Sequence, residues 1–418
     1  MAASPRTRHP RRSVSALVVA GVVAALLLAL AGGVAAKPPR HRTPSPSPTP
    51  APVTVTASAG PSAVPADRLA RLARGVSITR WFWNPEGIAW APDHAATYVS
   101  DDRLRAIRAA GFGHVRLPIE PKDLVDAAHP GRLDPALLAD LDAAIARMTA
   151  ADLAVLVDPH GWEDDWQEAL RTDPATQDAF VAMWSSLAAH LAATTDPSLV
   201  YLEVLNEPSF ATAEWQPILD RAVEAIRAVA PQHTIIVGPG LWNGIDGLEG
   251  FTPPADANLV VNVHDYDPFL FTHQTAAWAG TMGYVQGIPY PNDRYNGCDY
   301  LPKFGHDLDG WVEGYCTTEH WNADAVDARI AVAADWAAAH GNVPLTVNEF
   351  GVMPTAPYRD RLDWIRDTRA AVERHGAGWT IWGWDDGFGL DAVAQGTMDV
   401  GVLGALGMDV GAAIAAGD

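Results

Sequence analysis

Acidic and aromatic residues are missing from the beginning of this chain. The first 66 of its 418 residues contain no Asp, Glu, Phe, Trp or Tyr, and all 50 acidic residues lie from Asp67 onward. The break separates a leader from a folded part, residues 67–418. Its length is typical of a decorated barrel domain.

Basic residues are scarce in the folded part. Residues 67–418 hold 22 Lys and Arg against 50 Asp and Glu, a formal charge of −28. Such an acidic surface argues against nucleic acid and anionic membranes as partners. It is compatible with a neutral polymer such as a polysaccharide.

Cysteine is nearly absent, with only Cys298 and Cys316 in the chain. In an exported protein, such a pair predicts one disulfide bond. Zinc is the alternative, since His306 and His320 interleave with the cysteines, but the spacing matches no compact zinc motif.

The leader has the pattern of an export signal. Arg6, Arg8, Arg11 and Arg12 precede an uncharged run that ends in small residues at Ala36. This pattern predicts a cleaved secretory signal and a secreted protein. The apolar run is also long enough to cross a bilayer, so an uncleaved membrane anchor, with the domain outside the cytoplasm, is the alternative.

A proline-rich segment joins the signal or anchor, residues 1–36, to the folded part. Residues 37–66 contain nine prolines mixed with Ser, Thr and Ala. This composition predicts a stiff, extended linker that would hold the domain away from a membrane or wall.

Short β-branched runs alternate with amphipathic Ala- and Leu-rich segments from residue 74 onward. The expected strands are Gly75–Thr79, His114–Leu117, Ala154–Asp158, Val200–Leu205, Thr234–Val237, Leu259–Val263, Leu345–Asn348 and Trp379–Trp382. The expected helices include Asp101–Ala110, Pro135–Ala150, Thr176–Ala193, Ala213–Ala230, Ala323–His340 and Arg359–His375. Eight strands in this alternation predict an α/β fold, the (β/α)8 or TIM barrel. A doubly wound sheet is the alternative, although no glycine-rich phosphate loop follows the first strand.

One connection is unusually long. It runs from Asp265 to Asn322, after the sixth strand, and contains twelve aromatic residues and both cysteines. Disordered segments contain few aromatic residues, so this connection is expected to be ordered. We predict a disulfide-braced lid over the carboxyl end of the barrel, and a segment that only packs on the barrel's side is the alternative.

Two expected strands end in the same pair of residues. The fourth strand leads into Asn206-Glu207-Pro208, and the seventh leads into Asn348-Glu349. Barrel enzymes keep their chemistry at the carboxyl ends of the strands. Two facing carboxylates are what cleavage of a glycosidic bond needs, one as proton donor and the other as nucleophile or base.

With these motifs, the chain resembles the (β/α)8 glycoside hydrolases of the large retaining clan, specifically glycoside hydrolase family 5, the cellulase family. The resemblance covers roughly Ala73 to Trp384. Its motifs occur in barrel order: Arg116 in Gly-Phe-Gly-His-Val-Arg-Leu-Pro, His160 in Asp-Pro-His-Gly, Asn206-Glu207-Pro208, His264-Asp265-Tyr266, Asn348-Glu349-Phe350-Gly351, and Trp382.

The resemblance implies a role for each motif residue. Glu207 would be the general acid/base, which needs a raised pKa, and Glu349 the nucleophile, which must stay ionised. Arg116 would hold Glu349 in its charged form and orient it. Asn206 would bind the sugar 2-hydroxyl, a contact that tightens in the transition state.

The remaining motif residues would bind the sugar or the nucleophile. By the resemblance, Tyr266 would donate to the nucleophile, His160 and His264 would contact sugar hydroxyls, and Trp382 would lie under the sugar at the cleavage point. Five other tryptophans near strand ends are further platform candidates, although each could equally belong to the core: Trp81, Trp83, Trp162, Trp242 and Trp384.

The sequence therefore predicts a secreted, retaining β-glycosidase of a β-glucan, with β-1,4-glucan as the expected polymer. A β-mannanase or exo-β-1,3-glucanase would use the same catalytic residues. A non-catalytic carbohydrate-binding barrel and a metallohydrolase are the alternatives of other classes, the latter using His160, His264 and Asp265, which lack metal spacing. We expect a monomer acting on a polysaccharide or oligosaccharide without a cofactor or metal, because side chains supply the chemistry.

Overall fold

The computed structural model describes residues 64–84, 87, 89–126, 128–161, 164–294, 301–305, 308–384, 388–390 and 398–417. The predicted signal or anchor, most of the linker, Trp162, Cys298 and His306 lie outside these residues. Within the described residues, no helix is both long and apolar enough to cross a membrane. No described cysteine is a free thiol, and the disulfide stays a prediction.

Eight parallel strands close into a barrel in sequence order, which confirms the predicted (β/α)8 fold. Each strand pairs with its sequence neighbours, and β1 also pairs with β8. The strands are β1 (Arg74–Ser77), β2 (His114–Ile119), β3 (Ala154–Pro159), β4 (Val200–Glu203), β5 (Ile235–Val237), β6 (Leu259–His264), β7 (Leu345–Phe350) and β8 (Gly378–Ile381).

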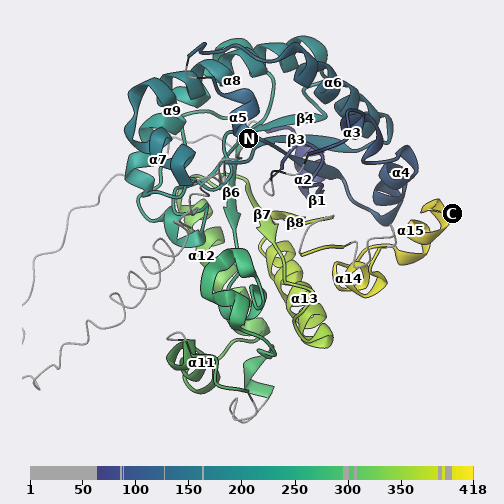
Figure 1. The fold of residues 1–418 in the computed structure, drawn as a ribbon, viewed down its shortest axis with the longest axis vertical. Coiled ribbons are helices and arrows are strands. Elements are labelled where there is room, and N and C mark those ends of the chain that lie inside the picture. The colour runs from purple at the N-terminus through teal and green to yellow at the C-terminus, as the bar shows by residue number, and fades with distance from the viewer. Residues whose placement is uncertain are drawn as a thin grey trace, which may run out of the picture.

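Helices surround the barrel on its outside (Figure 1). They are α2 (Ala66–Leu72), α3 (His94–Thr97), α4 (Asp101–Ala110), α5 (Pro121–Leu124), α6 (Pro135–Ala150), α7 (Asp164–Thr172), α8 (Pro174–Thr194), α9 (Thr212–Val229), α10 (Phe269–Thr272), α11 (Leu308–Thr317), α12 (Ala323–Ala339), α13 (Tyr358–Arg374), α14 (Val400–Ala405) and α15 (Val410–Gly417). Three 3-10 helices, η1 (Ile245–Leu248), η2 (Ala277–Tyr284) and η3 (Asn292–Arg294), are the remaining elements among the described residues.

Local signals in the sequence fix where the long helices begin. The Asp134 side chain accepts a hydrogen bond from the Ala136 amide at 2.8 Å, directly before the proline that opens α6. Asp173 caps α8 in the same way, again before a proline. Because a proline at the first helical position needs no amide partner, cap and proline together specify the start of the helix.

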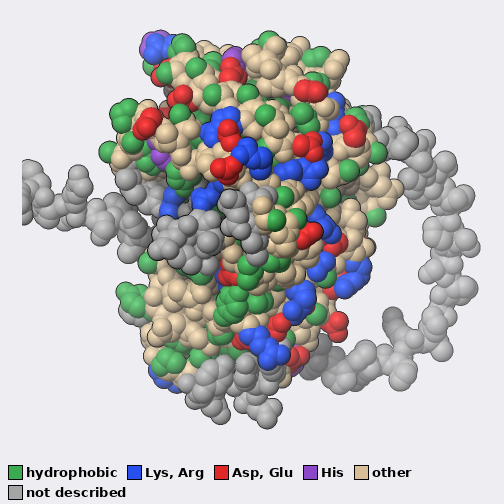
Figure 2. All heavy atoms as spheres, turned by 90° about the vertical axis from the view of Figure 1, so that its right-hand side faces the viewer, with side chains coloured by type: hydrophobic (Ala, Val, Ile, Leu, Met, Phe, Trp, Pro, Cys, Tyr) green, Lys and Arg blue, Asp and Glu red, His purple; other side chains and the backbone are tan. Residues whose placement is uncertain are grey.

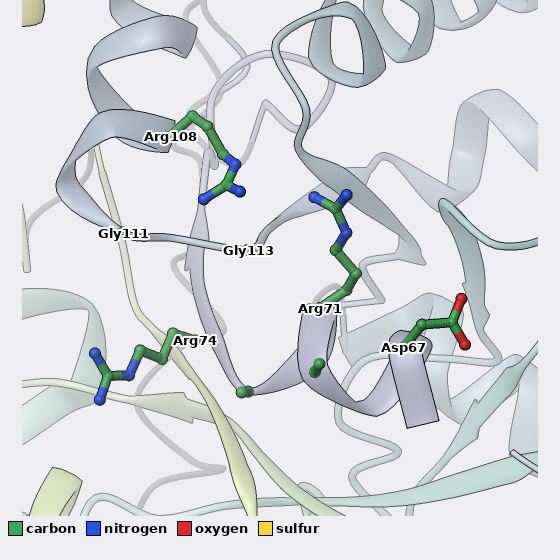
Figure 3. Close-up of a pocket in the computed structure, with 8 residues that line it drawn as sticks. Asp67, Arg71, Arg74, Arg108, Gly111 and Gly113 are labelled. Carbon is green, nitrogen blue, oxygen red and sulfur yellow. The ribbon is translucent and has the colours of Figure 1, made fainter. Parts of the chain in front are cut away.

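Helix α2 closes the amino end of the barrel. Leu72 packs in a small core with interior residues of β3 to β6, and Arg68 donates to the Gln232 carbonyl. Beside α2, Figure 3 shows a hollow lined by Arg71, Arg74 and Arg108. This hollow lies at the start of β1 and β2, and the strands that line it run from there toward the opposite, carboxyl end.

Charges of both signs alternate on the face drawn in Figure 2. In the hollow beside α2, Arg71 and Arg108 both pair with Asp152, and Arg74 pairs with Glu373 at 2.9 Å. These described arginines are therefore neutralised by neighbouring carboxylates and do not form a free basic tract.

The aromatic connection after β6 folds into α10, η2, η3 and α11. Its later part docks on the outer helix α13, where the Tyr290 amide donates to Asp360 and its hydroxyl to Asp367, at 3.1 and 3.0 Å. Figure 1 accordingly shows α11 at the end of the molecule, beyond α12 and α13.

The earlier part of this connection reaches the carboxyl end of the barrel. The ring of Trp278 lies 6.1 Å from that of Phe388, which follows β8. The prediction of a single lid was therefore too broad, because polar contacts of Tyr290 hold the later part against the barrel's side.

Candidate active site

The two predicted catalytic glutamates meet at the carboxyl end of the barrel. Nδ1 of His264, the last residue of β6, lies 2.7 Å from Oε1 of Glu207 and 3.6 Å from Oε2 of Glu349. One ligand atom from each of these three residues lies within 4.8 Å of the other two. Strands β4, β6 and β7 thus converge on one small polar centre.

The backbone of Glu207 is held in an uncommon conformation. Its φ is +45°, in the left-handed region that non-glycine residues rarely adopt. The Asn243 side chain accepts from the Glu207 amide at 2.7 Å, and the Gln167 side chain donates to the Glu207 carbonyl at 3.1 Å. These two contacts hold the turn that aims the carboxylate at the site.

The turn after β5 supplies Asn243 and places a tryptophan beside this site. Leu241, Trp242 and Asn243 all have positive φ, between 54° and 58°. The amides of Leu241 and Trp242 donate to the carbonyls of Phe210 and Pro208, both at 2.9 Å, which ties the turn to the chain just after Glu207. Trp242 remains 41% exposed, as expected for a candidate platform.

Arg116, fully buried on β2, binds the nucleophile candidate and three other side chains. Its Nη1 donates to Oε1 of Glu349 through a short contact. Its Nε and Nη2 donate to the two carboxylate oxygens of Glu203, at 2.8 and 2.9 Å. Nη2 also lies 2.9 Å from Asp158 and from Oδ1 of Asn206.

Charges and burial separate the roles of the two glutamates. Burial raises the pKa of Glu207 to about 8, with Arg116 opposing and the charges of Asp158 and Glu203 adding to the rise. Burial also raises the pKa of Glu349, but His264 and Arg116 oppose it. A carboxyl group that stays protonated near neutral pH suits a proton donor.

Tyr266 lies where the resemblance implies. Its hydroxyl donates to Oε2 of Glu349 at 3.0 Å, so that together with Arg116 it binds both oxygens of this carboxylate. Two donors on opposite oxygens favour the ionised form and fix its orientation.

His160 and Trp382 form one wall of the site. The His160 ring stacks on Trp382 with centroids 5.0 Å apart, and its Nδ1 lies 2.8 Å from Asp158. Burial lowers the pKa of His160 to about 3, so the ring is neutral. Trp83 packs against both rings, and Phe388 joins the same aromatic cluster.

The other predicted tryptophans divide between site and core. Trp81 is fully buried and donates to the Ala95 carbonyl at 2.8 Å, and Trp384 is 1% exposed. The hypothesis that these two residues line a sugar groove is therefore wrong. Their positions near strand ends could not distinguish a platform from core packing.

Asn206 has an unused donor in the site. Oδ1 accepts from Arg116, whereas Nδ2 is buried and has no hydrogen-bond partner among the residues that the structure describes. A buried donor without a partner is costly, and a sugar hydroxyl would satisfy it.

Several polar residues of the site were given no role from the sequence, although Asp158 and Asn348 stand in the quoted motifs. They are Asp158, Glu203, Gln167, Asn243, Asn262 and Asn348. Four of them, Asp158, Glu203, Asn262 and Asn348, lie in the buried strands β3, β4, β6 and β7. A polar residue in a fully buried parallel strand was the available signal, because such a side chain needs partners inside the barrel.

Glu207, His264 and Glu349 also have a spacing that could hold a metal ion. The donor set is explained without one, since His264 contacts both carboxylates and Arg116 and Tyr266 already bind Glu349.

A family model and curated relatives both relate this chain to the cellulases. Residues 74–387 match the model of the family Cellulase (glycosyl hydrolase family 5). Endoglucanase 3 of Fibrobacter succinogenes is 27% identical over 358 residues, which cover 81% of this chain but only 53% of that protein. Endoglucanase C of Acetivibrio thermocellus is 25% identical over 74% of this chain and 90% of its own length.

Solved structures show the same barrel. Endoglucanase Cel5A of Thermotoga maritima superposes with a TM-score of 0.66 at 25% identity, covering 82% of this chain and 99% of its own. The clostridial cellulose synthase subunit Z of Clostridioides difficile gives 0.65 at 25% identity, with 80% and 99% covered. The family match spans the barrel from β1 to just beyond β8 and includes the site described above. The chain is therefore a glycosidase that belongs to glycoside hydrolase family 5, the cellulase family.

Proposed function

We propose that the protein is a secreted β-glycosidase that cleaves β-1,4-glucan with retention of anomeric configuration. The observation that supports this most directly is the shared contact of Glu207 and Glu349 with His264, with one oxygen of each carboxylate within 4.8 Å of the other. Retaining pairs lie about 5–5.5 Å apart, whereas inverting pairs need about 6.5–9.5 Å for a water molecule.

In the first half of the reaction, the bond between the anomeric carbon and the leaving oxygen breaks. Glu349, oriented by Arg116 and Tyr266, attacks the anomeric carbon and forms a glycosyl-enzyme ester. Glu207 gives its proton to the leaving oxygen. Asn206 Nδ2 donates to the 2-hydroxyl as positive charge develops on the sugar.

In the second half, water replaces the leaving group. Glu207, now ionised, takes a proton from the water, which attacks the anomeric carbon and releases Glu349. Two displacements at one carbon restore the original β configuration. His264 stays neutral through the cycle because burial lowers its pKa to about 4, so it orients Glu207 without competing for charge.

The substrate assignment rests on aromatic surfaces and on the named relatives. Trp83 and Trp382 lie together on one side of the site, and the exposed Trp242 belongs to the turn whose Asn243 binds the Glu207 amide. Sugar rings pack their apolar faces on such side chains. Two of the relatives are endoglucanases, and the chain spans about half the length of one of them.

The leader supports secretion. Residues 1–36 would direct export or anchor the domain outside the cytoplasm, residues 37–66 would be the spacer, and residues 67–418 the catalytic domain. The domain would work as a monomer, since Glu207, Glu349, Arg116 and Tyr266 all come from one chain.

Hydrolysis of defined oligosaccharides tests the substrate. We expect the purified enzyme to cleave cello-oligosaccharides, with kcat/KM at least about tenfold above that for manno- or laminari-oligosaccharides, because one well-placed sugar contact is worth about 1–3 kcal/mol. A preference for either other series would make the protein a β-mannanase or a β-1,3-glucanase. Binding without cleavage of any series would favour a carbohydrate-binding barrel.

The pH dependence of kcat/KM follows from the two carboxyl groups. Glu207 must be protonated and its pKa is about 8, so we expect activity to fall as pH rises through about 8. Glu349 must be ionised, so activity also falls toward acidic pH, and burial places that limb above the ordinary glutamate value. A basic limb near the pKa of an ordinary glutamate would contradict the assignment of Glu207.

A further inference from the structure

Glu203 is the most extensively bound carboxylate described in the barrel. It lies at the end of β4 and is 1% exposed. Arg116 donates to both of its oxygens, at 2.8 and 2.9 Å. Asn262 on β6 and Asn348 on β7 donate to it as well, at 2.8 and 3.1 Å. Glu203 therefore receives four hydrogen bonds from residues on three strands. None of these bonds involves Glu207 or Glu349.

The geometry of Arg116 explains what this arrangement can do. A guanidinium group is planar, and its donors have fixed directions. Glu203 occupies the edge formed by Nε and Nη2, so Nη1 is directed to the other side, where it meets Oε1 of Glu349. Asp158 and Asn206 bind Nη2 only. Of the described partners of Arg116, Glu203 alone binds it at two nitrogens and so fixes the plane of the group.

We propose that Glu203 is a positioning residue: it holds Arg116 by one edge so that the other edge presents Nη1 to the nucleophile Glu349, and it takes up arginine charge that would otherwise act on Glu207. The proposal rests on the retaining mechanism above. It adds to that mechanism a residue that never touches the substrate.

Charge balance supports the second part of the proposal. Around Glu207 lie Glu203 at the end of β4, Arg116 on β2, Asp158 on β3 with His160 directly after that strand, His264 on β6 and Glu349 on β7. Both histidines are neutral because burial lowers their pKa, to about 3 for His160 and about 4 for His264. Arg116 is therefore the one cation in this set, and it faces four carboxyl groups.

The sign of the effect follows. The raised pKa of Glu207 comes first from burial, with Asp158 and Glu203 adding to it and Arg116 opposing. Removing the charge of Glu203 takes away a nearby negative charge and leaves Arg116 less neutralised. Both changes favour the ionised form of Glu207, so its pKa should fall and the basic limb of the pH profile should move to lower pH.

Two variants separate charge from geometry. Glu203→Gln keeps the size but removes the charge and one acceptor for Arg116, whereas Glu203→Asp keeps the charge but cannot span the same edge. Glu373→Gln is the matched control, because Glu373 binds Arg74, Arg369 and Trp379 outside the active site. For each variant, kcat and KM on a cello-oligosaccharide are measured across pH, together with the melting temperature.

We expect kcat to fall about 10- to 100-fold in both Glu203 variants, with KM within about threefold, because a misplaced nucleophile costs rate rather than binding. The basic limb should shift down by about half a pH unit or more in Glu203→Gln and stay in place in Glu203→Asp. Glu373→Gln should match the wild type in kcat, in KM and in the position of the basic limb. A Glu203→Gln profile that keeps the wild-type limbs, or a rate loss explained by unfolding in both variants, would overturn the proposal.

The effect of Glu203 on the pKa of Glu207 can be tested even if no substrate is found. If the wild-type enzyme cleaves none of the glycans, the proposed function fails, but the pKa of Glu207 can still be followed by ¹³C NMR of labelled carboxyl groups. A lower Glu207 pKa in Glu203→Gln would then uphold the charge effect, and an unchanged value would refute it.

Discussion

Replacing Glu349 by Gln should lower kcat by about four orders of magnitude or more while the protein stays folded. The amide has nearly the same size, and its one oxygen can still accept from Arg116, but its NH2 group replaces the oxygen that accepts from Tyr266, and it cannot attack the anomeric carbon. The measurement is steady-state hydrolysis of a cello-oligosaccharide, with circular dichroism to confirm the fold.

A matched control and a rescue make this result specific. Glu224 lies on the exposed face of α9, so Glu224→Gln should behave as wild type. In Glu349→Ala, azide has room to attack an activated β-glycoside directly, and this single displacement should yield the α-glycosyl azide. Near wild-type turnover in Glu349→Gln, or a β-azide product, would show that Glu349 is not the nucleophile.

Replacing Glu207 by Gln should lower kcat on cello-oligosaccharides by about 10²- to 10⁴-fold, the usual contribution of a general acid. The loss should depend on the leaving group, because a sugar hydroxyl needs protonation whereas a dinitrophenolate does not. With a dinitrophenyl glycoside, formation of the glycosyl-enzyme should continue at close to the wild-type rate, so a burst of dinitrophenol is expected.

The burst separates the two steps that Glu207 serves. Breakdown of the ester needs Glu207 as a base, so steady-state turnover after the burst should be slow. The Glu224→Gln variant should show wild-type kinetics in both phases. Equal losses on both kinds of substrate, without a burst, would mean that Glu207 acts through position or structure rather than as a proton donor.

Most of the barrel could be predicted from the sequence because its signals are local. The prolines and aspartates that begin α6 and α8, and the apolar runs of β2, β3 and β6, act within one element. Glu207 and Glu349 could be found because an apolar run that leads into Asn-Glu places the glutamate near the carboxyl end of a barrel strand, where barrel enzymes keep their chemistry.

The supporting side chains could not be found in this way. Glu203 and Asp158 stand in buried strands, and their role depends on Arg116, which reaches them from β2. Asn243 reaches the Glu207 amide from a left-handed turn after β5, and the residue types of this turn do not predict its conformation. Such contacts join positions far apart in the chain, and only the closed barrel brings them together.

The position of the aromatic connection after β6 also depends on contacts between residues far apart in the chain. Its composition indicated order, but not which surface it would cover. Tyr290 binds Asp360 and Asp367 on α13, whereas Trp278 lies beside Phe388 at the site. Aromatic content alone could not separate these two parts.

The measurement that tests the central claim most directly is the anomer released first, followed by ¹H NMR during hydrolysis of a cello-oligosaccharide. The short spacing of Glu207 and Glu349 around His264 predicts that the β-anomer appears first and then mutarotates to the equilibrium mixture. If the α-anomer appears first, a single displacement by water takes place, and Glu349 is not the covalent nucleophile of this enzyme.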